Sequence, residues 1–163
     1  MTDAAETSGQ TPEPTHEPEH PSLAPIKAKY AGRGLKAATY RGMTTVLCPK
    51  DPLHELLQFL RDDPACAYDL LSDVAGVDYL NYPQAEARFG VVYNLVSTTK
   101  TLRLFVKVLL DPSVDTTGTE HDPALHLPTV TDLWPGAEWP EREVFDMFGI
   151  RFDGHPDLRR ILT

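Results

Sequence analysis

Hydrophobic and polar residues alternate most regularly in two stretches near the middle of the chain. Residues 89–97 (FGVVYNLVS) and 102–110 (LRLFVKVLL) are rich in β-branched and aromatic residues. In the second stretch Arg103 and Lys107 fall on one face, and leucine and valine fill the other, which is the pattern of a half-buried strand. The short polar link between the stretches predicts that the two strands form a hairpin.

Weaker patterns precede the hairpin. Residues 44–48 are typical of a strand, and leucines recur at helical spacing through residues 52–61. Asp51 suits the N-cap of this helix, because its side chain can accept a hydrogen bond from a free backbone N–H. Residues 68–79 suit a strand with an irregular start, whereas residues 26–43 have no pattern that assigns them.

The C-terminal third begins with a long polar segment, residues 111–128, that shows no usable periodicity. A helix is predicted to start near Pro140, followed by a tight turn in which Gly154 can adopt a positive φ, and then by a second helix. The succession of elements predicts an α+β fold with two layers, a mixed or mostly antiparallel sheet, and helices packed on one face.

Composition divides the chain into two parts. Residues 1–25 contain five prolines and five acidic residues but no lysine, arginine or aromatic residue, which predicts a disordered acidic tail. Residues 26–163 are expected to form a single α+β domain. The tail carries −5 of the formal net charge of −9, so the domain is only mildly acidic.

Several classes of protein are disfavoured by these features. A mildly acidic domain without a basic stripe is not expected to bind nucleic acid, because phosphate neutralisation dominates that binding. The sequence has no apolar run of the roughly 20 residues that span a bilayer and no secretory signal, so we expect a cytoplasmic protein. Cys48 and Cys66 stand far apart and form no metal-binding pattern, which indicates buried, reduced thiols.

Residues 139–162 (WPEREVFDMFGIRFDGHPDLRRIL) concentrate acids, bases, a histidine and aromatic rings. One hypothesis is a metal-dependent hydrolase, in which Glu143 and Asp146 act as acid and base or bind a metal ion together with His155 and Asp157. Elsewhere the sequence offers no second cluster of ligands with suitable spacing, which weakens this hypothesis.

Two non-catalytic interpretations compete with it. The charges can form a solvated, salt-bridged helix face above a core contact made by Val144, Met147 and Phe148. Alternatively, the stretch is a docking surface, since aromatic residues beside arginine and acids are typical of protein–protein interfaces. A free-standing adaptor that docks an acidic partner through Arg159 and Arg160 is one form of this second interpretation. The aromatic residues concerned are Trp134, Trp139, Phe145, Phe148 and Phe152.

The stretch resembles the signature of the C subunit of the proton-pumping NADH:quinone oxidoreductase, respiratory complex I. Residues 128–135, 76–79, 82–83 and 88–93 also resemble this family. The positions that fill the signature are Glu141, Arg142, Glu143, Asp146, Met147, Phe148, His155, Arg159, Ile161 and Leu162.

The resemblance implies a scaffold subunit of the peripheral arm with no catalytic residue, cofactor or metal of its own and no activity in isolation. It implies binding to the D and B subunits at the cytoplasmic face of a bacterial cell membrane, as a peripheral protein. The complex would pass electrons from NADH through FMN and iron–sulfur clusters on partner subunits to quinone, coupled to proton translocation. The residues expected at subunit interfaces are Glu141, Arg142, Glu143, Asp146, Phe148, His155, Asp157, Arg159 and Arg160. We expect the charges of this docking surface to face other subunits, but the sequence leaves open which of these side chains point outward and which hold the turn together.

Two features leave alternatives open. Related subunits occur in energy-converting hydrogenases and in ferredoxin-fed quinone reductases, so either complex is an alternative assignment. Members of the family usually continue past the signature, and we therefore expect this chain to be a C-terminally shortened form.

Overall fold

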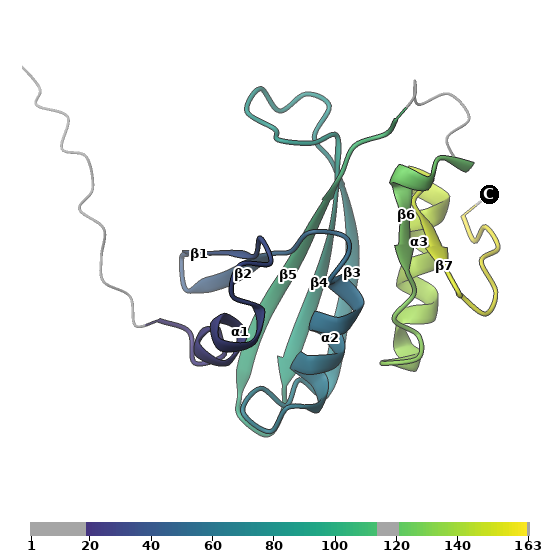
Figure 1. Cartoon of the computed structure of the whole chain (residues 1–163). Helices are drawn as coiled ribbons and strands as arrows, with labels where there is room; N and C mark the ends of the chain where they lie inside the picture. The colour runs from purple at the N-terminus through teal and green to yellow at the C-terminus, as the bar shows by residue number, and fades with distance from the viewer. Residues whose placement is uncertain (1–18, 114–120, 163) are drawn as a thin grey trace, which may run out of the picture.

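The computed structural model describes residues 19–113 and 121–162 and has a five-stranded sheet at its centre (Figure 1). The strands lie in the order β1-β2-β5-β4-β3. The pair β2 and β5 is parallel, and the other neighbours are antiparallel, so the sheet is mixed and mostly antiparallel, as predicted. The strands are β1 (Lys36–Tyr40), β2 (Met43–Leu47), β3 (Leu70–Asp78), β4 (Phe89–Ser97) and β5 (Leu102–Leu110).

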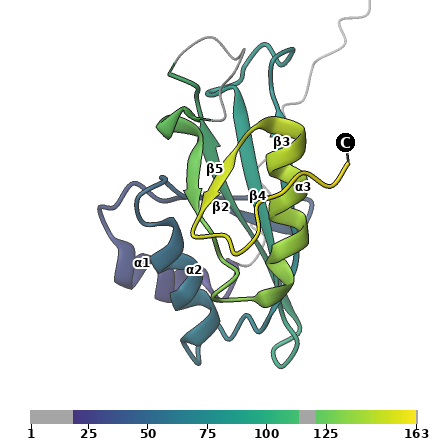
Figure 2. The same ribbon diagram turned by 90° about the vertical axis from the view of Figure 1, so that its right-hand side faces the viewer.

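Three α-helices pack on one face of this sheet (Figure 2). They are α1 (Leu23–Tyr30), α2 (Leu53–Asp62) and α3 (Glu138–Phe148). None of the helices within the described ranges has the length and apolarity needed to cross a membrane. Beside α3 lies a two-stranded parallel sheet, and short 3-10 turns precede its first strand and α3. These elements are η2 (Pro123–Leu125), β6 (His126–Pro128), η3 (Pro135–Ala137) and β7 (Arg151–Asp153).

Alternate residues of β4 and β5 pack against one face of α2 and form the centre of the core. Burial of each such side chain stabilises the fold by about 1.5–3 kcal/mol relative to exposure, so this layer is the main stabilising contact. Its fully buried members are Val91, Tyr93, Leu95, Leu104, Val106 and Val108 of the strands, with Leu53, Leu56, Leu57 and Leu60 of the helix.

The hairpin prediction is confirmed at both strands, since β4 and β5 have the predicted bounds and pair antiparallel. The alternation of faces in β5 is confirmed too, with Arg103 exposed and Leu104 buried. Cys48 and Cys66 are buried free thiols, as the sequence indicated.

The boundary predicted between tail and domain at residue 25 is wrong, because α1 begins at Leu23. Leu23 and Ile26 are buried, and the hydroxyl groups of Ser22 and Tyr68 are 2.9 Å apart. Apolar contacts therefore extend the folded domain toward the N-terminus, to residues whose composition alone resembles a tail. The predicted disorder of residues 1–18 lies outside the described residues.

Two helix starts also differ from the predictions. The N-cap of α2 is Pro52, with no side-chain capping bond, so Asp51 does not have the predicted role. Helix α3 starts at Glu138, two residues before Pro140. Proline is tolerated there because the first backbone N–H groups of a helix have no intrahelical partner to lose.

Candidate functional site

Residues 139–162 fold into one unit built from α3, β7 and the segment that follows β7. Gly149 ends α3 with φ 71°, and Gly154 turns the chain after β7 with φ 84°, conformations that favour glycine. The chain then crosses α3 on its way to the C-terminus (Figure 2). The second helix predicted after the turn does not form, because side chains of α3 bind the backbone groups of that segment.

Glu141 lies at the centre of this unit and is fully buried. Its Oε1 atom accepts a hydrogen bond from the backbone N–H of Val130 at 2.8 Å, and its Oε2 atom accepts one from Thr129 Oγ1 at 2.6 Å. Burial raises the pKa of Glu141 to about 7, although the two hydrogen bonds oppose that shift. The carboxyl group thus fastens α3 to the segment that follows β6.

The side chain of His155 is buried beside Glu141, with Nε2 3.9 Å from Glu141 Oε2. The backbone N–H of Asp157 donates to His155 Nδ1 at 3.0 Å, so the Nδ1 lone pair is occupied. In the neutral ring Nε2 then carries the hydrogen, which it donates to the carbonyl oxygen of Glu138 at 3.0 Å. Both nitrogens of His155 are therefore used to hold the turn after β7 against the start of α3.

Arg142 and Asp146, one helical turn apart on α3, hold the segment 159–162 by its main chain. Arg142 donates to the carbonyl oxygens of residues 159 and 160 at 2.9 and 3.5 Å. Asp146 Oδ2 accepts from the amides of residues 161 and 162 at 3.1 and 2.7 Å. We call Arg142, Asp146 and residues 159–162 the C-terminal clamp. Because these bonds involve main-chain atoms of the segment, they fix its path across α3 independently of its side chains.

The outer face of α3 carries an exposed stripe at a spacing of four residues, formed by Trp139, Glu143 and Met147. Trp139 is 62% exposed, and its ring lies 4.9 Å from the guanidinium carbon of Arg142. Tryptophan and methionine are both enriched at protein–protein interfaces, and tryptophan is enriched among their hot spots. These three are the exposed residues of α3, so the stripe is the most accessible part of the helix.

The sequence left open which of the signature charges point outward, and the structure shows that four of them point inward. Glu141 and Arg142 are buried as residues, and the side chains of Asp146 and His155 are nearly inaccessible to solvent. Their partners come from the chain itself, and so their charge and hydrogen-bonding capacity are used to hold the C-terminal unit together.

The other charged signature residues lie at the surface. Glu143 is exposed, and Arg159, with 77% of its side chain exposed, pairs with Asp157 at 2.6 Å. The guanidinium group lowers the pKa of Asp157. Arg160 is more than half exposed, with Nε 3.9 Å from Asp146 Oδ1. Their role at a subunit interface stays a prediction.

Most of the aromatic surplus is accounted for by the core. Trp134, Phe145 and Phe152 are buried. Phe148 is half-buried and packs over Gly76 of β3, where an added Cβ would overlap its ring. The composition of the stretch had suggested a wider aromatic interface than the structure shows, because most of these rings belong to the same hydrophobic core as the large sheet.

The residues proposed for a metal-dependent hydrolase do not form a ligand set. Within the described ranges, no group of three or more His, Cys, Asp or Glu side chains is arranged so that it could hold a metal ion. Glu143 is exposed, Asp146 binds two amides, and both ring nitrogens of His155 bind the main chain. The geometry therefore does not favour metal-assisted hydrolysis.

The sequence did not single out Thr129 as a partner of the buried carboxyl group. Thr129 precedes Glu141 by 12 residues, and no spacing rule connects a strand end to a helix at that separation. The one signal in the sequence was that Thr129 lies within residues 128–135, which resemble the family.

Comparisons with known proteins relate the chain to respiratory subunits. Residues 46–163 match the family described as "Respiratory-chain NADH dehydrogenase, 30 Kd subunit". The NADH-quinone oxidoreductase C subunit of Bartonella bacilliformis is 41% identical over 138 residues, which are 85% of this chain and 60% of that protein. The protein of the same name from Roseiflexus sp. is 44% identical, over 86% of this chain and 73% of that protein.

A third relative, the NADH-quinone oxidoreductase C subunit of Caulobacter vibrioides, is 48% identical over 75% of this chain. The chain spans 60% of the length of the Bartonella protein and 55% of the length of the Caulobacter protein.

Two solved structures share the fold. A trypsin-resistant fragment of Nqo5 superposes with a TM-score of 0.68 at 35% identity, over 83% of this chain and 98% of the fragment. A chain of an archaeal membrane-bound sulfane sulfur reductase superposes with a TM-score of 0.65, over 87% of this chain and 74% of that chain. At 23% identity the second likeness concerns the fold alone.

Proposed function

Because the chain belongs to the family of the 30 kDa subunit of respiratory-chain NADH dehydrogenase, we propose that it is a non-catalytic scaffold subunit of an NADH-quinone oxidoreductase. In this role it docks the D and B subunits in the peripheral arm of the complex, at the cytoplasmic face of a bacterial membrane. FMN and the iron–sulfur clusters are carried by partner subunits, and the whole complex transfers electrons from NADH to quinone coupled to proton translocation.

The observation that carries the scaffold role is the use of the buried signature side chains. Glu141 binds Thr129 and the amide of Val130. Arg142, Asp146 and His155 bind main-chain atoms of the C-terminal unit. Side chains that are bonded in this way stabilise the conformation of the C-terminal unit. The exposed stripe of α3 then remains as a surface that a partner can bind.

The test is recovery of the complex with an affinity-tagged copy of the full chain, expressed in a bacterial host from which the resident subunit has been deleted. We expect mass spectrometry to find the D and B subunits in stoichiometric amounts. The isolated chain should carry neither flavin nor iron and should oxidise no NADH. Recovery of the chain without D and B, or stoichiometric flavin or iron on the isolated chain, would overturn the proposal.

The same experiment tests the docking surface with a matched pair of variants. Met147→Asp places a charge in the exposed stripe, and Thr99→Asp places the same charge in the exposed β4–β5 turn. We expect Met147→Asp to reduce the recovery of D and B roughly tenfold, because loss of a hot-spot contact costs more than about 1 kcal/mol. Thr99→Asp should leave recovery unchanged, and both variants should melt close to the unsubstituted chain.

A further inference from the structure

The second face of the large sheet is covered by no helix in the described part of the chain. Residues that pair directly across neighbouring strands share a face, so the strand register identifies the side chains on this one. They are half-buried or exposed, whereas the side chains on the opposite face of β4 and β5 are buried except for the half-buried Leu102. One row that crosses all five strands consists of Ala75, Val92, Lys107, Leu47 and Lys36.

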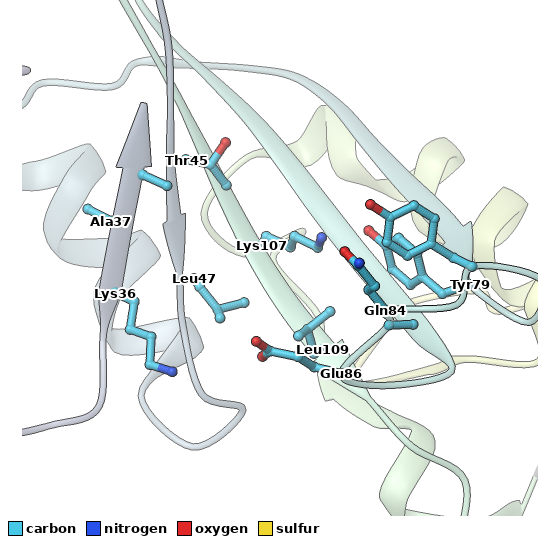
Figure 3. A pocket seen from close by; sticks show the side chains of 12 residues that line it. Lys36, Ala37, Thr45, Leu47, Tyr79, Gln84, Glu86, Lys107 and Leu109 are labelled. Atoms are coloured by element: carbon cyan, nitrogen blue, oxygen red, sulfur yellow. The ribbon is translucent and has the colours of Figure 1, made fainter. Parts of the chain in front are cut away.

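A cavity of about 500 Å³ opens on this face, above β1, β2 and β5 (Figure 3). Leu47 and Leu109 contribute apolar side chains to its lining, and Tyr79 and Tyr82 contribute aromatic rings from the loop between β3 and β4. Its volume lies within the range of roughly 300–1,000 Å³ that is usual for binding pockets. The cavity can accept a large apolar side chain.

Two lysines line the cavity from different strands, Lys36 from β1 and Lys107 from β5 (Figure 3). Neither forms a salt bridge with a described carboxylate. Lys107 Nζ lies 4.6 Å from the centroid of the Tyr79 ring, which packs closely over Gly90. Among the described residues that line the cavity, Glu86 is the one acid. The cavity thus combines an apolar lining with two cations that no described acidic side chain pairs with.

The edge strand β1 borders the same cavity. All five of its residues are exposed, and within the described sheet it pairs with β2 alone. An exposed edge presents unpaired N–H and C=O groups, and proteins usually protect such edges with prolines, bulges or several charges. Here Lys36 is the one charged residue of the strand, and the strand contains no proline. The edge is open to an added strand.

From these features we infer that the uncovered sheet face is a second docking surface, and that its occupant is an extended acidic segment of another subunit. An apolar or aromatic side chain of the segment enters the cavity between Leu47 and Leu109, and neighbouring carboxylates pair with Lys36 and Lys107. The part of the segment that enters the cavity crosses the uncovered face, and the chain beyond it continues to the free edge of β1. The inference rests on the proposed function, because it requires an assembly that supplies the segment.

Two variants in the assembled complex test this inference. Lys36→Glu reverses one cation of the cavity, and Ala38→Trp fills its volume from β1. We expect each to accelerate dissociation of the chain from the purified complex roughly tenfold, through lost charge pairing or lost space. The matched controls are Lys100→Glu in the β4–β5 turn and Ala65→Trp after α2, both at exposed positions. They should dissociate at the rate of the unsubstituted chain.

A photo-reactive phenylalanine at position 38 identifies the occupant. In the purified complex we expect it to cross-link to a peptide of another subunit that has aspartate or glutamate within a few residues of the linked position. A cross-link to a second copy of this chain, to lipid or to a peptide without acidic residues would overturn the inference, as would no cross-link at all.

The outcomes separate this inference from the proposed function. If the unsubstituted chain assembles but the cavity variants behave like their controls, the second docking surface alone is wrong. If the unsubstituted chain does not assemble with the oxidoreductase subunits, the proposed function fails first.

Discussion

Among single residues, Glu141 shows how burial changes the role of a charged side chain. An ionised carboxylate is costly to bury, and the two hydrogen bonds from Thr129 and Val130 offset only part of that cost. The pKa of Glu141 is accordingly raised from 4.5 to about 7. The residue therefore titrates near neutral pH, although its carboxyl group has no access to solvent.

The raised pKa of Glu141 predicts a specific dependence of stability on pH. Between pH 4.5 and about 7 the unfolded chain has lost this proton while the folded chain retains it, so the free energy of unfolding falls as pH rises. The total effect is about 3 kcal/mol, since each pKa unit corresponds to about 1.4 kcal/mol. Glu141→Gln lacks this contribution.

Chemical denaturation of both proteins from pH 4 to pH 8 measures the effect. The stability of Glu141→Gln relative to the unsubstituted chain should increase across the window. Because the two proteins share all other carboxyl groups, the difference between their pH profiles cancels the contribution of those groups. Parallel pH profiles for the two proteins would contradict the assignment of a raised pKa to Glu141.

Among the secondary-structure elements, α3 is positioned by two kinds of contact. Its inner face packs on β3, where Phe148 lies over Gly76. The Phe148 ring also contacts Phe89 of β4 edge to face, with ring centroids 6.3 Å apart. The other contact of α3 is the C-terminal clamp, which holds residues 159–162 across the helix. The packing contact requires glycine at position 76, because any side chain there would overlap the Phe148 ring. The clamp requires the positive charge of Arg142 and the negative charge of Asp146.

The packing contact predicts that Gly76→Ala destabilises the domain by about 1–3 kcal/mol, because the new Cβ overlaps the Phe148 ring and forces a shift of α3. Phe148→Leu in the same chain shortens the opposing side chain. The double variant should cost less than the sum of the two single variants, as measured by denaturant unfolding. Additive costs would show that the two positions do not compete for space.

The clamp predicts that Asp146→Ala releases the segment 159–162, since two amides lose their acceptor. We expect faster hydrogen exchange at residues 161 and 162, and faster trypsin cleavage after residues 159 and 160. The loss of stability should be about 1–3 kcal/mol. Mass spectrometry of timed digests measures the cleavage.

Glu143→Ala is the matched control for the clamp, because it removes an exposed acid from the same helix. It should change stability by less than about 0.5 kcal/mol and leave the cleavage rate unchanged. Equal cleavage of the two variants would show that Asp146 does not hold the segment.

In the molecule as a whole, the two faces of the large sheet have different roles. One face carries α1, α2, α3 and the small sheet, and it holds nearly all the fully buried residues (Figure 2). The other has an apolar cavity and two lysines without a described salt-bridge partner (Figure 3). It also ends at β1, an edge strand that pairs with β2 alone within the described sheet. One face stabilises the domain, and the proposed scaffold role requires the other face and the outer stripe of α3 to be accessible, as they are in the described part of the chain.

Much of the fold follows from local patterns. The β4–β5 hairpin was predictable because alternation with a period of two fixes both the strand and its buried face. Two elements near the N-terminus were not predictable in the same way. Helix α1 has only a weak amphipathic pattern, and β1 is exposed along its length, so neither carries a strong local signal of burial. Their positions depend on contacts with α2 and β2.

The fold class, the central hairpin, the glycine turn after β7 and the family of the signature could all be read from the amino-acid sequence. The fold class and the hairpin follow from hydrophobic periodicity, the turn follows from the backbone freedom of glycine, and the family follows from a long motif. All of these are local along the chain. Which charges of residues 139–162 face inward could be learned only from the packed domain. Burial of Glu141 and His155, and capture of the C-terminal segment by Arg142 and Asp146, depend on atoms that come together only when distant segments pack.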